Sequence, residues 1–145
     1  MNVKKVATAG ALLCLVLSVA GCGKSDRAMP LTKENVMAYR EKLVGSRDEI
    51  TMKDRQEAQK SLHGTRRLFA QTFVAPMEKL GYSYDMTVRS FAEKLEKGEL
   101  ASGDPETRTQ VEGFILMAKS TADFAVKNGF ISLETKKVLD RVHEK

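Results

Sequence analysis

Residues 104–129, with the sequence DPETRTQVEGFILMAKSTADFAVKNG, carry the clearest structural signal in the chain. Asp104 is a helix-capping residue type, proline is favoured at the first helical position, and Glu106 complements the positive end of a helix. Asn128 and Gly129 are typical of a helix end. The stretch therefore predicts one long helix with an apolar stripe that faces a core. The stripe consists of Val111, Phe114, Ile115, Ala118, Ala122, Ala125 and Val126.

The segments on either side repeat this helical spacing, and none shows the alternation or β-branched enrichment of a strand. Capping residues and glycines predict helices over 32–45, 51–75 and 85–97, and a last helix after Ser132. Pro76 should kink or end the second of these before a stop at Gly81. The sequence thus predicts an all-α fold, a compact bundle of about five helices joined by short connections.

The first 21 residues have the composition of a removable export signal. Lys4 and Lys5 give a positive start, and residues 6–19 are almost entirely apolar. This run is shorter than the roughly 18 to 20 apolar residues that cross a bilayer. A cleaved signal peptide is therefore favoured over a permanent membrane span.

The residues Val19-Ala20-Gly21-Cys22 resemble the lipobox of bacterial lipoproteins, in which an aliphatic and two small residues precede an obligatory cysteine. The resemblance covers residues 1–23. It implies cleavage before Cys22 and a covalent diacylglyceryl lipid on its thiol, usually with an acylated amino group. In a Gram-negative host it also implies the periplasmic face of the outer membrane, because Gly23 stands where an aspartate tends to cause inner-membrane retention. An ordinary secreted protein with a coincidental cysteine is the alternative.

The chain accordingly divides into a signal peptide over 1–21, a lipidated cysteine and tether over 22–30, and a helical domain over 31–145. Cys14 leaves with the signal and Cys22 takes the lipid, so the mature chain would contain no free thiol and no zinc site of cysteine type. Residues 22–145 have 22 basic and 19 acidic side chains, whose signs alternate along the chain. That pattern argues against a nucleic-acid partner, which would need basic residues on one face.

Candidate chemistry is sparse. The two histidines, His63 and His143, do not have metal-ligand spacing, so neither a metal nor another cofactor is expected beyond the lipid. His63, Arg66 and Arg67 lie at helical spacing and form a candidate contact for an anion or a partner, with an ordinary exposed polar face as the alternative. Tyr82 and Tyr84 are candidate partner contacts beside a helix start, with burial of one ring as the alternative.

The sequence contains no nucleophile elbow, phosphate-cradling glycine loop or nucleophile with a nearby base. We therefore expect no enzyme, although folding could bring Glu78 or Asp123 beside another carboxylate.

Two functions are favoured, ahead of a third, the enzymatic degradation of cell-wall material. The first is a membrane-anchored periplasmic lipoprotein that acts as a binding or assembly module for an envelope protein, with methionines such as Met37, Met77, Met86 and Met117 available to line a groove. The second is a ligand-handling lipoprotein with an apolar pocket for a lipid or an envelope-stress molecule. An enclosed apolar pocket above roughly 300 Å³ favours the second function, and an open apolar groove favours the first.

Overall fold

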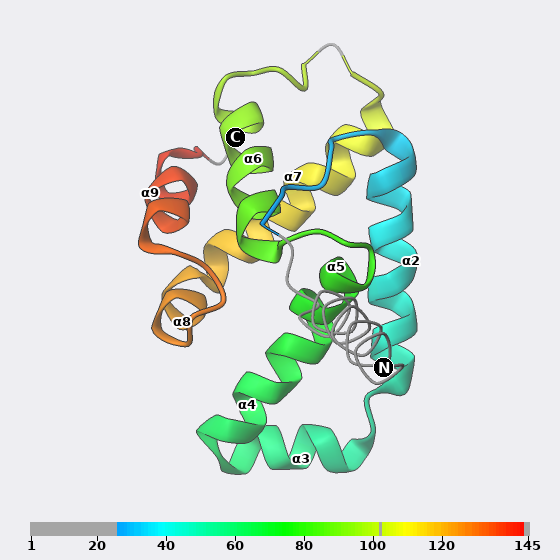
Figure 1. Cartoon of the computed structure of the whole chain (residues 1–145), viewed down its shortest axis with the longest axis vertical. Helices are drawn as coiled ribbons and strands as arrows, with labels where there is room; N and C mark the ends of the chain where they lie inside the picture. The colour runs from blue at the N-terminus through cyan, green and yellow to red at the C-terminus, as the bar shows by residue number, and fades with distance from the viewer. Residues whose placement is uncertain (1–25, 102, 144–145) are drawn as a thin grey trace, which may run out of the picture.

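A computed structural model describes residues 26–101 and 103–143 of the chain, and these residues are helical without a strand (Figure 1). The all-α prediction is confirmed. The predicted lipobox residues and Gly23 lie outside the described residues. The elements are α2 (Lys33–Glu49), α3 (Met52–Lys60), α4 (Leu62–Phe69), the π-helical turn η1 (Ala70–Val74), α5 (Ala75–Lys79), α6 (Tyr84–Glu96), α7 (Pro105–Ser120), α8 (Ala122–Lys127) and α9 (Leu133–Arg141).

Helix α2 begins where the sequence predicts it and ends later. The hydroxyl of Thr32 accepts a hydrogen bond from the Asn35 amide at 3.2 Å, as an N-cap does. The predicted end at Gly45 is wrong, because α2 continues to Glu49. A glycine inside a helix costs only about 1 kcal/mol relative to alanine, and the added turn buries Ser46.

The predicted helix over 51–75 is not continuous, because the chain reverses at Ser61. Ser61 has an extended backbone and caps α4 by accepting a hydrogen bond from the Gly64 amide at 3.0 Å. Gly64 lies directly against the backbone carbonyl of Glu57, where a Cβ atom would collide. Helix α3 has no buried residue. The α3–α4 pair therefore forms an arm at the lower end of the molecule in Figure 1.

The chain stays helical on both sides of Pro76, so the predicted helix does not end there. The preceding turn widens into the π-helical turn η1, and Pro76 then lies in the first turn of α5. A wider turn accommodates a residue that has no amide hydrogen to donate. The predicted stop at Gly81 is confirmed by its positive φ of 88°.

The long helix predicted over 104–129 is divided at Thr121. The carboxylate of Asp104 caps α7 by accepting a hydrogen bond from the Thr107 amide at 2.9 Å, as predicted, and this bond lowers the pKa of Asp104. Thr121 ends α7, and its hydroxyl donates to the carbonyl of Met117 at 2.9 Å. Side-chain bonds of this kind compete with the helix ladder, and α8 leaves in a new direction.

The core lies between α2, α5, α6, α7, α8 and α9. Its most deeply buried large side chains are Met29, Met77, Val88, Val111, Ile115 and Leu139. Phe91 is buried, whereas Phe114, which belongs to the predicted core-facing stripe, is only partly buried and packs edge-on against the rings of Tyr39, Tyr84 and Phe91. The expectation that Phe114 is a central core residue is therefore too strong.

The end of the predicted tether belongs to the domain. Met29 is 1% exposed, and its amide donates to the hydroxyl of Thr87 at 2.9 Å. The Ser83 amide donates to the carbonyl of Arg27 at 2.9 Å. An apolar side chain and two backbone bonds thus fix residues 27–29 on the fold.

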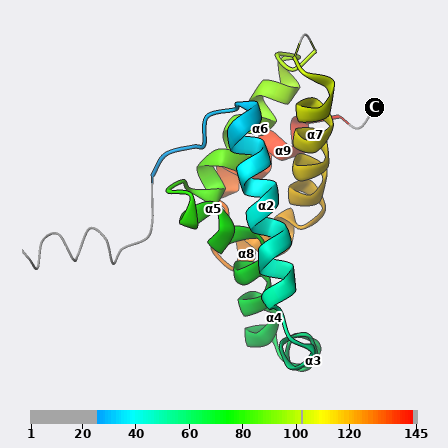
Figure 2. The ribbon, with the colours of Figure 1, turned by 90° about the vertical axis from the view of Figure 1, so that its right-hand side faces the viewer.

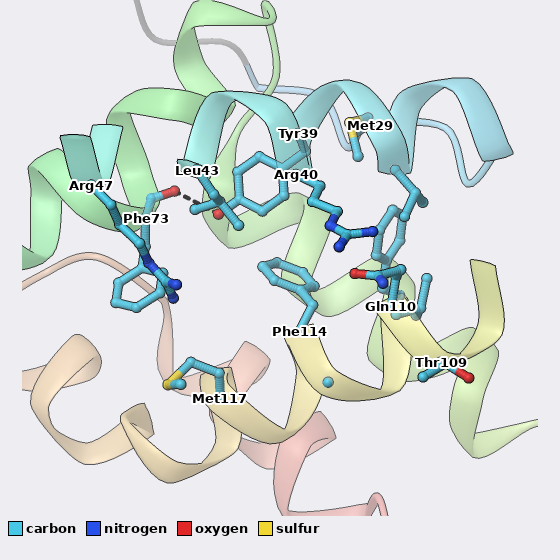
Figure 3. A pocket seen from close by; sticks show the side chains of 14 residues that line it. Met29, Tyr39, Arg40, Leu43, Arg47, Phe73, Thr109, Gln110, Phe114 and Met117 are labelled. Atoms are coloured by element: carbon cyan, nitrogen blue, oxygen red, sulfur yellow. Dashed lines mark hydrogen bonds between the residues drawn. The ribbon is translucent and has the colours of Figure 1, made fainter. Parts of the chain in front are cut away.

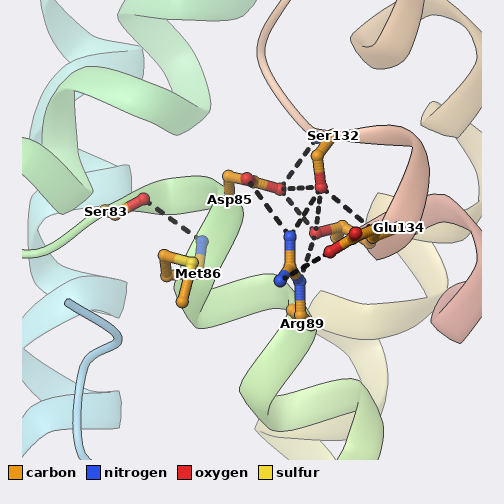
Figure 4. A network of polar contacts seen from close by, with 7 residues as sticks. Ser83, Asp85, Met86, Arg89, Ser132 and Glu134 are labelled. Carbon is orange, nitrogen blue, oxygen red and sulfur yellow. Dashed lines mark hydrogen bonds and ion pairs between the residues drawn. The ribbon is translucent and has the colours of Figure 1, made fainter. Parts of the chain in front are cut away.

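A polar network fixes the start of α9 on α6 (Figure 4). Asp85 accepts hydrogen bonds from the Ser132 amide at 2.9 Å and the Thr135 hydroxyl at 2.5 Å. The guanidinium of Arg89 donates to the hydroxyls of Ser132 and Thr135, and it also pairs with Glu134 at 3.3 Å. Because the polar side chains of this network bond to one another, the network holds the start of α9 against α6.

Candidate binding groove

An open apolar groove runs between α2 and α7 (Figure 3). It has a volume of about 200 Å³. Its wall on α2 includes Val36, Tyr39 and Leu43, its wall on α7 includes Val111, Phe114 and Met117, and Phe73 of η1 closes one end.

The floor of the groove is fixed by aromatic contacts. The Tyr39 hydroxyl donates to the backbone carbonyl of Phe73 at 2.8 Å, and the Tyr39 ring meets that of Phe114 edge-on with centroids 5.4 Å apart. Burial raises the pKa of Tyr39 well above its ordinary value, and the nearby Tyr84 adds to this shift. Tyr39 therefore stays protonated and keeps donating, which holds the π-helical turn against α2.

Two arginines of α2 stand at the groove. Arg40 and Arg47 line it, and Figure 3 shows both side chains pointing from α2 across the groove toward α7. Both residues are exposed, and neither forms an ion pair with another described residue. Several other arginines of the described chain do have carboxylate partners, namely Arg67, Arg89, Arg108 and Arg141.

Exposed apolar side chains occur on both helices that form the groove walls. Val44 on α2 is 52% exposed and Met117 on α7 is 44% exposed. Large apolar side chains that stay in water beside an apolar groove are typical of binding surfaces.

A second hollow adjoins the groove at the corner where α2 is followed by α3. It has a volume of about 400 Å³ and is lined by Arg47, Ile50, Arg55, Leu68 and Thr72. Arg47 lines both hollows, so the groove continues past Arg47 into a more polar region.

The cluster predicted from His63, Arg66 and Arg67 lies on α4, and none of the three residues lines either hollow. His63 and Arg66 are exposed. Arg67 instead joins the two helices of the arm through an ion pair with Asp54 at 3.0 Å. The pKa of Asp54 is lowered by hydrogen bonds from the amide and hydroxyl of Thr51, and Arg67 contributes to this shift. The structure thus gives Arg67 a structural partner, and the anion contact at this cluster stays a prediction.

The two predicted tyrosines have different surroundings. Tyr84 is 4% exposed and packs edge-on against Phe69 and Phe114, and its burial raises its pKa. The prediction that Tyr84 contacts a partner is therefore wrong, because its ring is part of the core. Tyr82 is half-buried, and the guanidinium of Arg27 lies over its ring, 5.4 Å from the centroid.

The groove is lined mainly by apolar side chains and by the two arginines. The residues that line it include no carboxylate, histidine or cysteine. Among residues 26–101 and 103–143, no three histidine, cysteine or acidic side chains gather as metal ligands would. No described helix is both long enough and apolar enough to span a bilayer.

Sequence reasoning missed most of the groove. Of the four methionines considered as groove residues, Met117 lines it and Met77 is completely buried. One available clue was Arg40, which interrupts the apolar stripe of α2 and lines the groove. No protein-family model, curated protein or solved structure matches this chain.

Proposed function

We propose that this chain is a membrane-anchored binding module without catalytic chemistry, which docks an envelope protein in the groove between α2 and α7. One observation carries the proposal: the groove is open and apolar, and its two arginines have no carboxylate partner among the described residues. Arginine is a favoured side chain at the centres of protein interfaces.

The partner segment that fits the groove is an acidic amphipathic helix. Arg40 and Arg47 are seven residues apart on one helix, so they lie about 10.5 Å apart along its axis. Two carboxylates one heptad apart on a partner helix match that distance. Apolar side chains between them would enter the groove beside Leu43, Phe114 and Met117, as in other complexes that place a helix in a groove.

Membrane attachment is the other part of the proposal. It rests on the resemblance of residues 19–22 to a lipobox, with the lipid on Cys22. Two or three acyl chains anchor a protein firmly, because each buried methylene contributes about 0.8 kcal/mol. An anchored module would keep its partner close to the membrane.

Ligand handling is less well supported. That function calls for an enclosed apolar pocket above roughly 300 Å³. The apolar groove is smaller, at about 200 Å³, and the hollow of about 400 Å³ is open and has two arginines among its five lining residues.

Photocrosslinking in the native envelope tests the proposal. A benzophenone amino acid replaces Thr109 or Met117, two exposed residues that line the groove, or the control Leu133, which is 57% exposed on α9. We expect one protein to crosslink from both groove positions and not from position 133. Equal crosslinking from all three positions would contradict the proposal, and crosslinks to lipid alone would favour ligand handling.

Charge reversal then tests the chemistry of the partner. The double variant Arg40→Glu, Arg47→Glu should abolish the groove crosslinks, because it places carboxylates against carboxylates. Lys137→Glu is the control, since Lys137 on α9 is also an exposed cation without an ion pair in the described chain. Groove crosslinks that survive the double reversal would exclude an acidic partner.

A further inference from the structure

The described chain begins at a fixed point on the corner between α5 and α6. The Arg27 carbonyl accepts from the Ser83 amide at 2.9 Å, and the Arg27 guanidinium lies over the ring of Tyr82. Two residues later, Met29 is buried and bonded to Thr87. Arg27 therefore cannot leave this corner without breaking contacts of the fold.

The chain between the proposed lipid site and this fixed point is short. Cys22 and Arg27 are five residues apart, so their Cα atoms lie at most roughly 18 Å from each other, however the residues between them are arranged. A domain of roughly 115 residues has a radius of gyration near 13 Å and is about 35 Å across. The connection is therefore shorter than the domain is wide.

We infer that the corner formed by Arg27, Lys79 and Tyr82 faces the membrane and contacts phospholipid headgroups. The inference rests on the proposed lipid anchor at Cys22. If the side that carries α7 faced the bilayer instead, Arg27 would lie farther from the lipid than the connection reaches, because α7 and the start of the described chain are on opposite sides in Figure 2.

The side chains of the corner suit a headgroup layer. Tyr82 is half-buried with an aromatic ring, and tyrosine is enriched at membrane–water boundaries. Arg27 and the exposed Lys79 are cations that can contact phosphate groups. Asp26 and Glu78 lie next to them in the sequence, so the short connection, rather than net charge, determines which side faces the bilayer.

This orientation places the α7 wall of the groove away from the membrane, whereas Met29, which also lines the groove, lies close to the corner. Helix α7 lies on the side away from the start of the described chain (Figure 2). A partner would then reach the groove from the α7 side.

Lipid-dependent fluorescence quenching tests the orientation on the full-length lipidated protein. A single cysteine replaces Lys79 at the corner or Leu116 on α7, which is 52% exposed, and carries a bimane fluorophore. The protein is reconstituted into vesicles of phosphatidylcholine and phosphatidylglycerol that contain a headgroup nitroxide lipid. We expect flotation with the vesicles and much stronger quenching at position 79 than at position 116.

A longer connection between Cys22 and Arg27 provides the second part of the test. A Gly-Ser insertion of about ten residues after Gly23 extends the maximum reach by roughly 30 Å. It should reduce quenching at position 79 without changing flotation.

Equal quenching at the two positions, or stronger quenching at position 116, would overturn the orientation while leaving the anchor in place. Unchanged quenching at position 79 after the insertion would do the same. Failure to float would remove the anchor itself, and with it both this inference and the membrane part of the proposed function. The groove part is tested separately by the crosslinks.

Discussion

Replacing Asp85 with alanine should destabilise the fold by about 2–4 kcal/mol. Asp85 accepts from the Ser132 amide and the Thr135 hydroxyl, and it pairs with Arg89 at 3.8 Å. A hydrogen bond to a charged group contributes about 1.5–3 kcal/mol, and a donor left without a partner adds its own cost. Part of the loss is offset because Arg89 still donates to the hydroxyls of Ser132 and Thr135.

The measurement is urea unfolding followed by circular dichroism. It uses the chain from Ser25 onward, which we expect to fold as a helical monomer because all described helices and the contacts of Arg27 and Met29 lie within it. Asp85→Asn keeps an acceptor oxygen and should cost only about 1 kcal/mol. Glu134→Ala is the surface control, and it should change stability by less than about 0.5 kcal/mol because Glu134 is 78% exposed.

An Asp85→Ala variant within about 0.5 kcal/mol of the native chain would refute the reasoning. An equal loss in Glu134→Ala would refute it too, because stability would then depend on the exposed ion pair and not on the bonds to the start of α9. Hydrogen exchange locates the effect, since the amide of Ser132, which donates to Asp85, should exchange faster in Asp85→Ala than in either control.

Further predictions concern single residues. Phe114→Ala should lower the free energy of unfolding by about 2–4 kcal/mol. This loss is near the lower end for a buried phenylalanine, because one side of the ring faces the groove. Arg66→Ala should lower the free energy of unfolding by less than about 0.5 kcal/mol in the same urea assay. Gly64→Ala should lower the free energy of unfolding by about 1–3 kcal/mol, because the added methyl group collides with the backbone carbonyl of Glu57 in α3. Amide hydrogen exchange in α3 should become faster. Unchanged exchange would contradict this packing of α4 on α3. Cys22→Ser should abolish palmitate labelling in cells, and Gly23→Asp should move a Gram-negative host's protein toward the inner membrane, as fractionation would measure.

The helix starts could be predicted from sequence because caps are local. Thr32, Ser132 and Asp104 each accept a hydrogen bond from an amide three residues later. Such a bond needs only a few consecutive residues, so the residue type alone is informative. The helix ends at Gly98 and Gly129 were equally predictable, because both have a positive φ, which glycine adopts without strain.

Two of the internal breaks were missed because they depend on contacts between helices. Ser61 could equally be a polar residue within a long helix, and it becomes a cap because Gly64 lets α4 fold back onto α3. The turn before Pro76 is π-helical where the Tyr39 hydroxyl of α2 reaches the carbonyl of Phe73. Neither contact can be recognised from the residues of the helical segment whose conformation it changes.

The groove could not be predicted for a related reason. On α2 the same helical stripe contains Val36 and Tyr39, which are buried, and Arg40 and Val44, which are exposed. A pattern of apolar residues indicates which face is shielded from water, and it does not distinguish shielding by the chain's own core from shielding by a partner. The charges make that distinction here. Where α6 and α9 meet within the fold, Arg89 is paired with carboxylates, whereas Arg40 has no such partner at the groove. A partner that supplies the missing carboxylate accounts for both the arginine and the open apolar surface beside it.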